Sequence, residues 1–157
     1  VPYNLWERQG VLMTTEGNVV HYGYIEKFIE RLGEKFNIRE IAFDRWGAVQ
    51  MVQNLEGMGF TVVPFGQGFK DMSPPTKELM KLVLEEKIAH GGHPVLRWMM
   101  DNIFIRTDPA GNIKADKAKS TEKIDGAVAT IMALDRAIRC GNENGASVYD
   151  DRGILFI

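Results

Sequence analysis

The stretch Ile38-Arg39-Glu40-Ile41-Ala42-Phe43-Asp44 predicts a buried strand that ends in an acid, because a compact run of β-branched and aromatic residues is typical of a sheet interior. The segment before it has the spacing of an amphipathic helix. Its apolar residues recur at offsets of three and four: Ile25, Phe28, Ile29, Leu32 and Phe36. Helix followed by strand is the repeating unit of an α/β fold.

The segment after Asp44 repeats this alternation. A second helical stripe, stopped by Gly57 and Gly59, consists of Ala48, Met51, Val52 and Leu55. Phe60-Thr61-Val62-Val63 then predicts another buried strand, and Val11 to Thr15 predicts a short strand before the first helix. Strands separated by helices and short connections pair in parallel, so the sequence predicts a layered α/β domain.

The second half of the chain predicts helices around one hairpin. Ser73-Pro74 predicts the cap and first turn of a helix, and a shorter helix follows the break at 90–94. A cluster of turn-forming residues lies between the run Ile103 to Arg106 and Ile113, which predicts a β-hairpin. A final amphipathic helix is predicted from Ile124 to Ile138.

Composition limits the protein class. A chain of 157 residues that is 45% hydrophobic and 25% charged fits one globular domain. The formal charge of −2 gives no global attraction for nucleic acid, so phosphate binding requires a local basic patch. No apolar run approaches the roughly 20 residues of a membrane span. We expect a soluble intracellular protein, and the missing initiator Met suggests a fragment of a larger one.

Two aspartates are the main candidates for chemistry. Asp44 lies at the carboxyl end of a predicted strand, where parallel α/β sheets collect their ligands. Asp125 opens the final helix directly after a basic segment that contains Lys114, Lys117, Lys119 and Lys123. Carboxylates that hold a divalent cation beside lysines that hold phosphate are the parts of a metal-dependent nuclease.

Each of these features also has a structural alternative. Asp44 could cap the helix that follows it, and an acid such as Asp125 in the first turn of a helix is stabilised by the helix dipole without any catalytic role. The basic segment could be a solvated loop whose charge is diluted by Asp116 and Glu122.

Other residues give weaker signals. His90 and His93 in a Gly-Gly turn are a poor zinc pattern. The remaining candidates have structural explanations. Asp101 and Asp108 are interpreted as turn or cap residues, and Trp46 and Trp98 as core or rim aromatics. No phosphate-binding glycine motif and no Ser/His/Asp order is present.

Several strings together resemble the C-terminal nuclease domain of the large terminase subunit of tailed phages. They follow one another in the order of that family and extend the resemblance from about Val1 to Arg139: residues 41–46 (IAFDRW), 63–68 (VPFGQG), 90–99 (HGGHPVLRWM) and 116–126 (DKAKSTEKIDG). We therefore expect a terminase-type nuclease domain over residues 1–139 and a C-terminal tail over 140–157.

The resemblance implies an α/β fold of the ribonuclease H-like type, with a mixed sheet flanked by helices. It also implies an endonuclease that cuts concatemeric viral DNA by a two-metal mechanism, with Asp44 and Asp125 as catalytic metal ligands. Mg²⁺ or Mn²⁺ suits such hard oxygen ligands. Lys114, Lys117, Lys119 and Lys123 would contact double-stranded DNA, with Lys117 and Lys119 nearest to the scissile backbone.

The family pattern has one more aspartate, on a first central strand that has no counterpart before Val1. We therefore expect weak metal binding, slow or absent cleavage by this chain alone, and an exposed strand edge that favours homo-oligomers. The partners implied are the ATPase motor domain, the small terminase subunit and the portal, in the cytoplasm of a bacterial host. Alternatives are a non-catalytic DNA-binding or assembly module of prophage origin and another ribonuclease H-like enzyme such as a resolvase.

Overall fold

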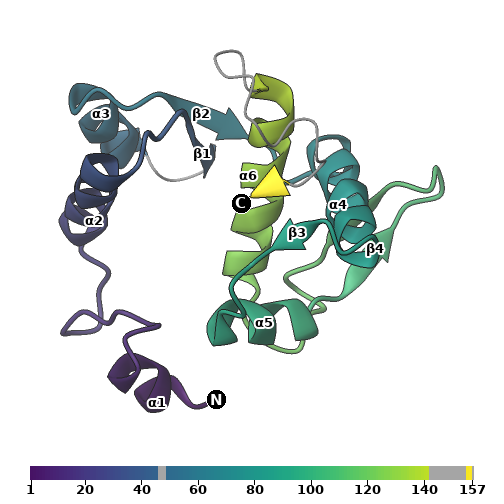
Figure 1. Cartoon of the computed structure of the whole chain (residues 1–157), viewed down its shortest axis with the longest axis horizontal. Coiled ribbons are helices and arrows are strands. Elements are labelled where there is room, and N and C mark those ends of the chain that lie inside the picture. Colours follow the sequence, from purple (N-terminus) through teal and green to yellow (C-terminus); the bar gives the residue numbers. More distant parts are fainter. Residues whose placement is uncertain (46–48, 142–154, 157) are drawn as a thin grey trace. The chain divides into compact units, whose positions relative to one another are not determined.

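The computed structural model describes residues 1–45, 49–141 and 155–156. The chain divides into two compact units, Val1–Gly66 and Gln67–Ile157, and each is considered by itself (Figure 1). The predicted boundary at residue 139 stays a prediction. Within the described ranges, no helix combines the length and the apolar character needed to cross a lipid bilayer.

Unit 1 alternates helices and strands as the sequence predicts. Its elements are α1 (Tyr3–Arg8), α2 (Tyr22–Lys35), β1 (Ile41–Asp44), α3 (Val49–Gly57) and β2 (Val62–Phe65). The two strands pair in parallel with Ile41 opposite Val62 and Asp44 opposite Phe65, which confirms the predicted parallel pairing. In the part of the chain that the structure describes, β1 has β2 as its single strand neighbour.

Helices α2 and α3 pack together in unit 1. The Asn54 side-chain amide donates a 2.9 Å hydrogen bond to the Glu26 carboxylate, and so joins the two helices. Gly33 faces the ring of Phe60, because a Cβ added at Gly33 would lie 2.9 Å from the ring atom Cζ. The apolar stripe of α2 therefore meets the segment between α3 and β2.

The strand predicted at Val11 to Thr15 is wrong. Residues 11–20 form bends and irregular backbone, and most of their side chains are exposed. The apolar residues Val11, Leu12 and Met13 are consecutive and do not alternate with polar ones, so the run has no single apolar side to bury in a sheet. Helix α1, which buries Trp6, precedes this segment and was not predicted.

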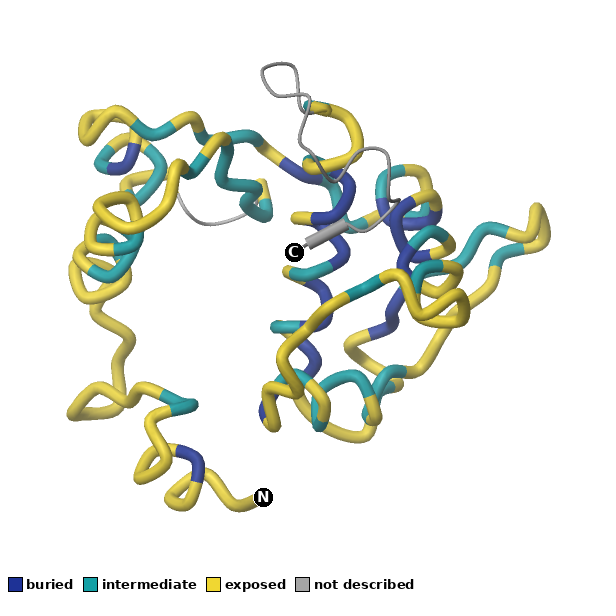
Figure 2. Tube along the Cα trace, viewed as in Figure 1, coloured by how far each residue is buried: buried dark blue, intermediate teal, exposed yellow. Residues whose placement is uncertain are grey.

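Unit 2 is built around a long helix. Its elements are α4 (Phe69–Leu84), β3 (Ile88–Ala89), α5 (Pro94–Asp101), β4 (Ile105–Thr107), β5 (Ile113–Ala115), α6 (Asp125–Cys140) and β6 (Leu155–Phe156). The buried residues run along α6 and the facing side of α4 (Figure 2). Those on α6 and directly before it are almost fully shielded from solvent: Ile124, Ala127, Val128, Ile131 and Leu134.

The predicted start of α4 is wrong. Helix α4 begins at Phe69, so Ser73 and Pro74 lie inside it instead of capping it. The Ser73 hydroxyl instead accepts a 3.1 Å hydrogen bond from the Ile113 amide of β5. A proline inside a helix removes a backbone donor and normally marks a helix start, which is why local sequence favoured the later residue.

The predicted hairpin is confirmed. Strands β4 and β5 pair antiparallel, with Arg106 opposite Lys114. Asp108 closes the turn, because one carboxylate oxygen accepts from the amides of Ala110 and Asn112 and the other accepts from the Asn112 side chain, at 2.8–2.9 Å. Gly111 supplies the positive φ of 77° that the turn requires.

The Asp108 turn should weaken in acid. The Asn112 side chain, followed by the Asn112 and Ala110 amides, lowers the pKa of the Asp108 carboxyl below its ordinary value. A lowered pKa in the folded state means that the turn is stabilised above the ordinary pKa and loses this contribution as the pH falls through the folded pKa. We expect Asn112→Ala to raise the pKa of Asp108 in a carbon-detected NMR titration, and Asn18→Ala, in the irregular segment of unit 1, to leave it unchanged.

Candidate metal and phosphate site

Asp44 is the last residue of β1 in unit 1. The parallel pairing of β1 with β2 places Asp44 at the carboxyl end of the small sheet, opposite Phe65, as the sequence predicts. This is the edge at which α/β sheets hold their ligands. Trp46, a predicted core or rim aromatic, and the proposed helix start at 46–47 lie outside the described residues.

Asp125 is the first residue of α6 in unit 2. The preceding Ile124 is 1% exposed and anchors the helix start in the core, whereas the Asp125 side chain is 64% exposed. The buried neighbour fixes the backbone, and the carboxylate is left accessible to a ligand. Asp44 and Asp125 belong to different units, and their sharing of one cation stays a prediction.

The structure brings Asp125 together with one of the predicted lysines. The Lys117 ammonium lies 2.9 Å from Asp125 Oδ1. The Lys117 side chain is 47% exposed, and ion pairs between exposed groups contribute less than about 1 kcal/mol. A divalent cation could therefore replace Lys117 at Asp125 with little loss of stability.

The other predicted lysines are placed differently. Lys114 on β5 donates to the Gln67 carbonyl at 3.2 Å and lies 5.3 Å from the centre of the Phe69 ring. Lys119 lies 5.4 Å from the centre of the Phe104 ring, and Lys123 is exposed just before α6. Lys114 and Lys117 thus line one hollow, of about 220 Å³, and Lys119 is held against a separate aromatic ring.

Asp116 organises the loop that carries these lysines. Its Oδ1 atom accepts from the amides of Ala118 and Lys119 at 2.9 and 3.3 Å, and its carbonyl accepts from the amide and hydroxyl of Ser120. The Ser120 hydroxyl in turn accepts from the Phe104 amide. Asp116 is 8% exposed and fixes the backbone on which Lys117 and Lys119 are presented. The sequence had suggested that Asp116 merely dilutes the basic charge, and its structural role was missed.

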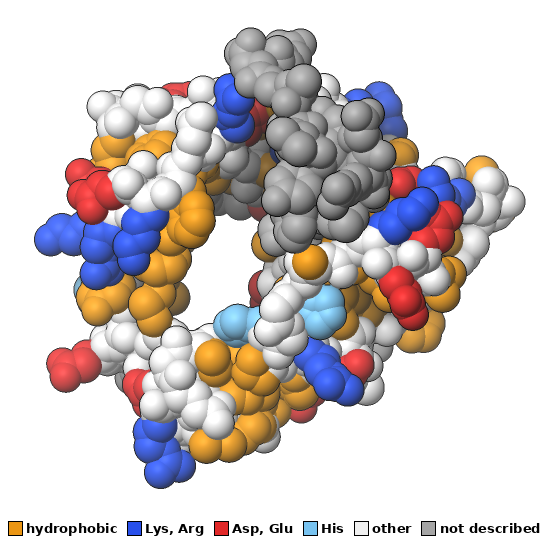
Figure 3. Space-filling model, viewed as in Figure 1, with side chains coloured by type: hydrophobic (Ala, Val, Ile, Leu, Met, Phe, Trp, Pro, Cys, Tyr) orange, Lys and Arg blue, Asp and Glu red, His pale blue; other side chains and the backbone are white. Residues whose placement is uncertain are grey.

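Arg106 is a second residue that sequence reasoning missed. It lies opposite Lys114 in the hairpin, and its guanidinium is 3.8 Å from Asp116 Oδ2 and 6.0 Å from the centre of the Phe69 ring. The sequence did contain a signal for this role, because the predicted hairpin places Arg106 opposite Lys114, at the same distance from the turn. Figure 3 shows basic and acidic side chains next to each other on the visible face of unit 2.

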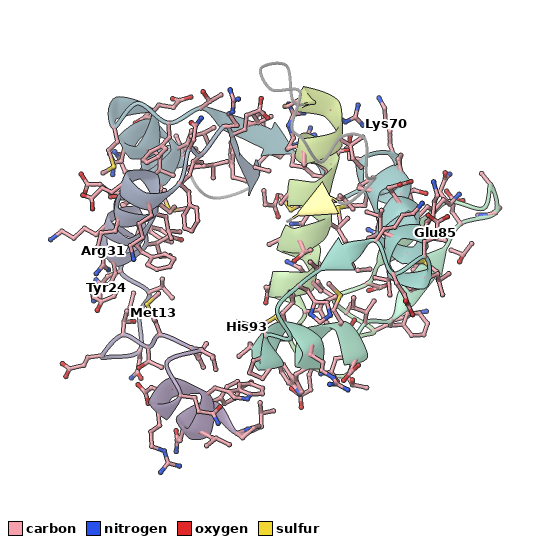
Figure 4. All side chains as sticks on the ribbon, in the orientation of Figure 1. Met13, Tyr24, Arg31, Lys70, Glu85 and His93 are labelled. Carbon is pink, nitrogen blue, oxygen red and sulfur yellow. The ribbon has the colours of Figure 1, made fainter. Side chains whose placement is uncertain are left out.

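The two histidines have structural roles. His93 caps α5 by accepting from the Leu96 amide through Nδ1 at 3.4 Å, and His90 Nδ1 accepts from the Gly92 amide at 3.1 Å (Figure 4). Among the described residues, no group of three or more His, Cys, Asp and Glu side chains is close enough to hold a metal ion. The candidate donors for a metal stay the two predicted carboxylates, Asp44 and Asp125, whose hard oxygen atoms fit Mg²⁺ or Mn²⁺.

Comparison with known proteins places the chain in a family. The sequence profile of the family described as "Terminase large subunit, endonuclease domain" matches residues 1–140. The chain belongs to this family. It is 40% identical over 152 residues to the large terminase subunit of Enterobacteria phage HK97, and covers 30% of that protein. It is 31% identical over 147 residues to protein YmfN of Escherichia coli K12, and covers 32% of it.

A solved structure supports the same assignment. The crystal structure of the large terminase of bacteriophage HK97 matches with a TM-score of 0.80 and 40% sequence identity, over 87% of this chain and 29% of that one. The mixed α/β arrangement of the terminase endonuclease domain is thereby confirmed, and it is consistent with the predicted ribonuclease H-like fold. The chain spans about a third of the length of the relatives that it matches.

Proposed function

We propose that the chain is the catalytic portion of a metal-dependent DNA endonuclease that cuts concatemeric viral DNA during packaging. In this proposal Asp44 and Asp125 hold Mg²⁺ or Mn²⁺ in a two-metal site, and Lys114, Lys117, Lys119 and Lys123 hold the DNA backbone. The observation that carries the proposal is the 2.9 Å ion pair between Lys117 and Asp125, in a chain that belongs to the terminase endonuclease family.

The chain's own groups suit this chemistry. The carboxylates are metal ligands, and bound cations would supply an activated water and stabilise the leaving oxygen. Lys114 is half-buried on β5, and the other three lysines are exposed on the segment between Asp116 and α6, so their ammonium groups can reach a phosphate. Lys117 neutralises Asp125 without a metal and becomes available for DNA when a cation takes its place.

The proposed partners follow from the family. Double-stranded DNA is the substrate, and the ATPase motor, the small terminase subunit and the portal are the packaging partners in the cytoplasm of a bacterial host. The exposed edge of β1 would permit pairing with a second copy of the chain. The described part of β1 has β2 as its one strand neighbour, which supports this arrangement.

Replacing single lysines tests the DNA-binding part of the proposal. Each DNA phosphate that a lysine neutralises contributes about 0.9 to the magnitude of the slope of log K against log salt concentration on duplex DNA. We expect Lys114→Gln, Lys117→Gln, Lys119→Gln and Lys123→Gln each to lower this slope by about that amount, and to weaken binding equally for different sequences. Fluorescence anisotropy with a short duplex at several salt concentrations measures both quantities.

Lys87→Gln is the matched control. Lys87 belongs to the same unit and is 54% exposed, but it pairs with Glu85 at 2.8 Å beyond the far end of α4 (Figure 4). Its replacement should leave the salt slope unchanged. Equal slopes for all five variants would contradict the assignment of DNA contacts to the basic segment.

A further inference from the structure

Three positive side chains and one carboxylate surround the small hollow of unit 2. Arg106 comes from β4, Lys114 from β5 and Lys117 from the loop, and Asp116 supplies the carboxylate. The hollow measures about 220 Å³, and it lies beside the ring of Phe69 at the start of α4. Lys117 is also paired with Asp125 at 2.9 Å, so the positive charge that stays in excess in this concave place belongs to Arg106 and Lys114.

The arrangement of the cations is costly without an anion. Arg106 and Lys114 are paired across the hairpin, and like charges directly opposite each other on neighbouring strands destabilise a sheet. The ring of Phe69 offsets part of this cost, because both cations lie over it at 6.0 and 5.3 Å from its centre. Asp116 compensates only in part, because its carboxylate is 3.8 Å from the Arg106 guanidinium and already accepts from two amides.

The surrounding structure fixes these groups before any ligand arrives. Lys114 is tied to the Gln67 carbonyl, and the Gln67 side chain lies 3.8 Å from the sulfur of Met132 on α6. Lys117 follows the turn that Asp116 closes. Cations that are already held in place lose little entropy when a ligand binds. A guanidinium group can also donate two parallel hydrogen bonds to the oxygens of one phosphate.

From this geometry we infer that the hollow binds a single phosphate group, with Arg106 as its principal donor, Lys114 as the second donor, and Lys117 as a third once it is released from Asp125. The identification of that group as a DNA backbone phosphate rests on the proposed function, whereas the anion site itself does not. Arg106 is thereby assigned to phosphate recognition, and Asp116 becomes a positioning residue that also limits how much positive charge the hollow carries.

Two substitutions with opposite expected effects test the inference. Arg106→Gln removes the principal donor, and we expect the affinity for inorganic phosphate to fall roughly 10-fold, since charge-assisted hydrogen bonds are the strong ones. Asp116→Asn keeps an oxygen that can accept from the amides of Ala118 and Lys119, but it removes the negative charge. We expect phosphate affinity to rise by about 3-fold or more at low salt.

The measurement is an NMR titration of the metal-free chain with inorganic phosphate in the presence of EDTA, followed through the Arg106 side-chain signal and the amides of residues 114–120. Arg31→Gln, on the exposed face of α2, is the matched control and should have no effect (Figure 4). Arg106 is 56% exposed and lies opposite a like charge, so its replacement should not lower the thermal unfolding temperature.

The outcomes separate this inference from the proposed function. Phosphate affinity that falls with Arg106→Gln and rises with Asp116→Asn supports the site, even if the chain binds no Mn²⁺. Affinity that both variants leave unchanged overturns the inference, even if Asp125 binds a metal. A duplex DNA titration then identifies the source of the phosphate: displacement of inorganic phosphate by DNA supports the backbone assignment, and simultaneous binding of both overturns it.

Discussion

The Asp125→Asn variant should bind Mn²⁺ more than about 100-fold more weakly than the unchanged chain. Loss of a residue that only hydrogen-bonds to a metal ligand lowers metal affinity by about 10–100-fold, and loss of the ligand itself should lower it further. The variant should also remove Mg²⁺-dependent cleavage from any protein that carries this chain. The fold should survive, since Asp125 is 64% exposed and an acid in a first helical turn stabilises by only about 0.3–1 kcal/mol. Titration followed by the EPR signal of free Mn²⁺ measures the affinity.

Glu122→Gln is the control for Asp125→Asn. Glu122 is an exposed acid three positions earlier, in the loop that leads into α6, and its loss changes the net charge by the same amount. Mn²⁺ affinity should be retained in this variant. A comparable loss for both variants would mean that the loop attracts cations through its general charge, and that Asp125 is not a ligand.

The Leu134→Ala variant should lower the free energy of unfolding of the chain by about 2–5 kcal/mol, the range for removing a fully buried leucine side chain from a tightly packed core. Leu134 is 1% exposed on α6, the helix that packs on both α4 and α5. Urea denaturation followed by circular dichroism gives the change in free energy.

Ile138→Ala is the control on the same helix. The predicted amphipathic helix ends at Ile138, and this side chain is 52% exposed. Its replacement should change the unfolding free energy by less than about 0.5 kcal/mol. Similar losses for both variants would show that the core of unit 2 does not lie where the structure puts it.

Local sequence patterns predicted the helices and strands whose own residues show a clear helical or strand pattern. Helices α2 and α6 have long stripes at helical spacing, and β1 and β2 are compact β-branched runs, so all four were predicted with small shifts at their ends. The hairpin was found from its turn residues, as was the role of Asp108. The placement of Asp44 and Asp125 at element ends followed directly from these boundaries.

What sequence reasoning missed depends on contacts between distant residues. The start of α4 was misplaced because Ser73 is bonded by Ile113, 40 residues later, and no local pattern shows such a contact. Asp116 and Arg106 gain their roles only when the hairpin and the following loop fold against each other. In the same way, Lys117 and Asp125 pair only because the loop between them turns back. The amino-acid composition of that loop does not predict the turn.

Anomalous diffraction from crystals of the chain soaked in Mn²⁺ tests the central claim most directly. The proposed function predicts a manganese peak that is ligated by the carboxylates of both Asp44 and Asp125, with Lys117 displaced from Asp125. Manganese bound elsewhere or not at all, with the Lys117 to Asp125 pair intact at 2.9 Å, would contradict it.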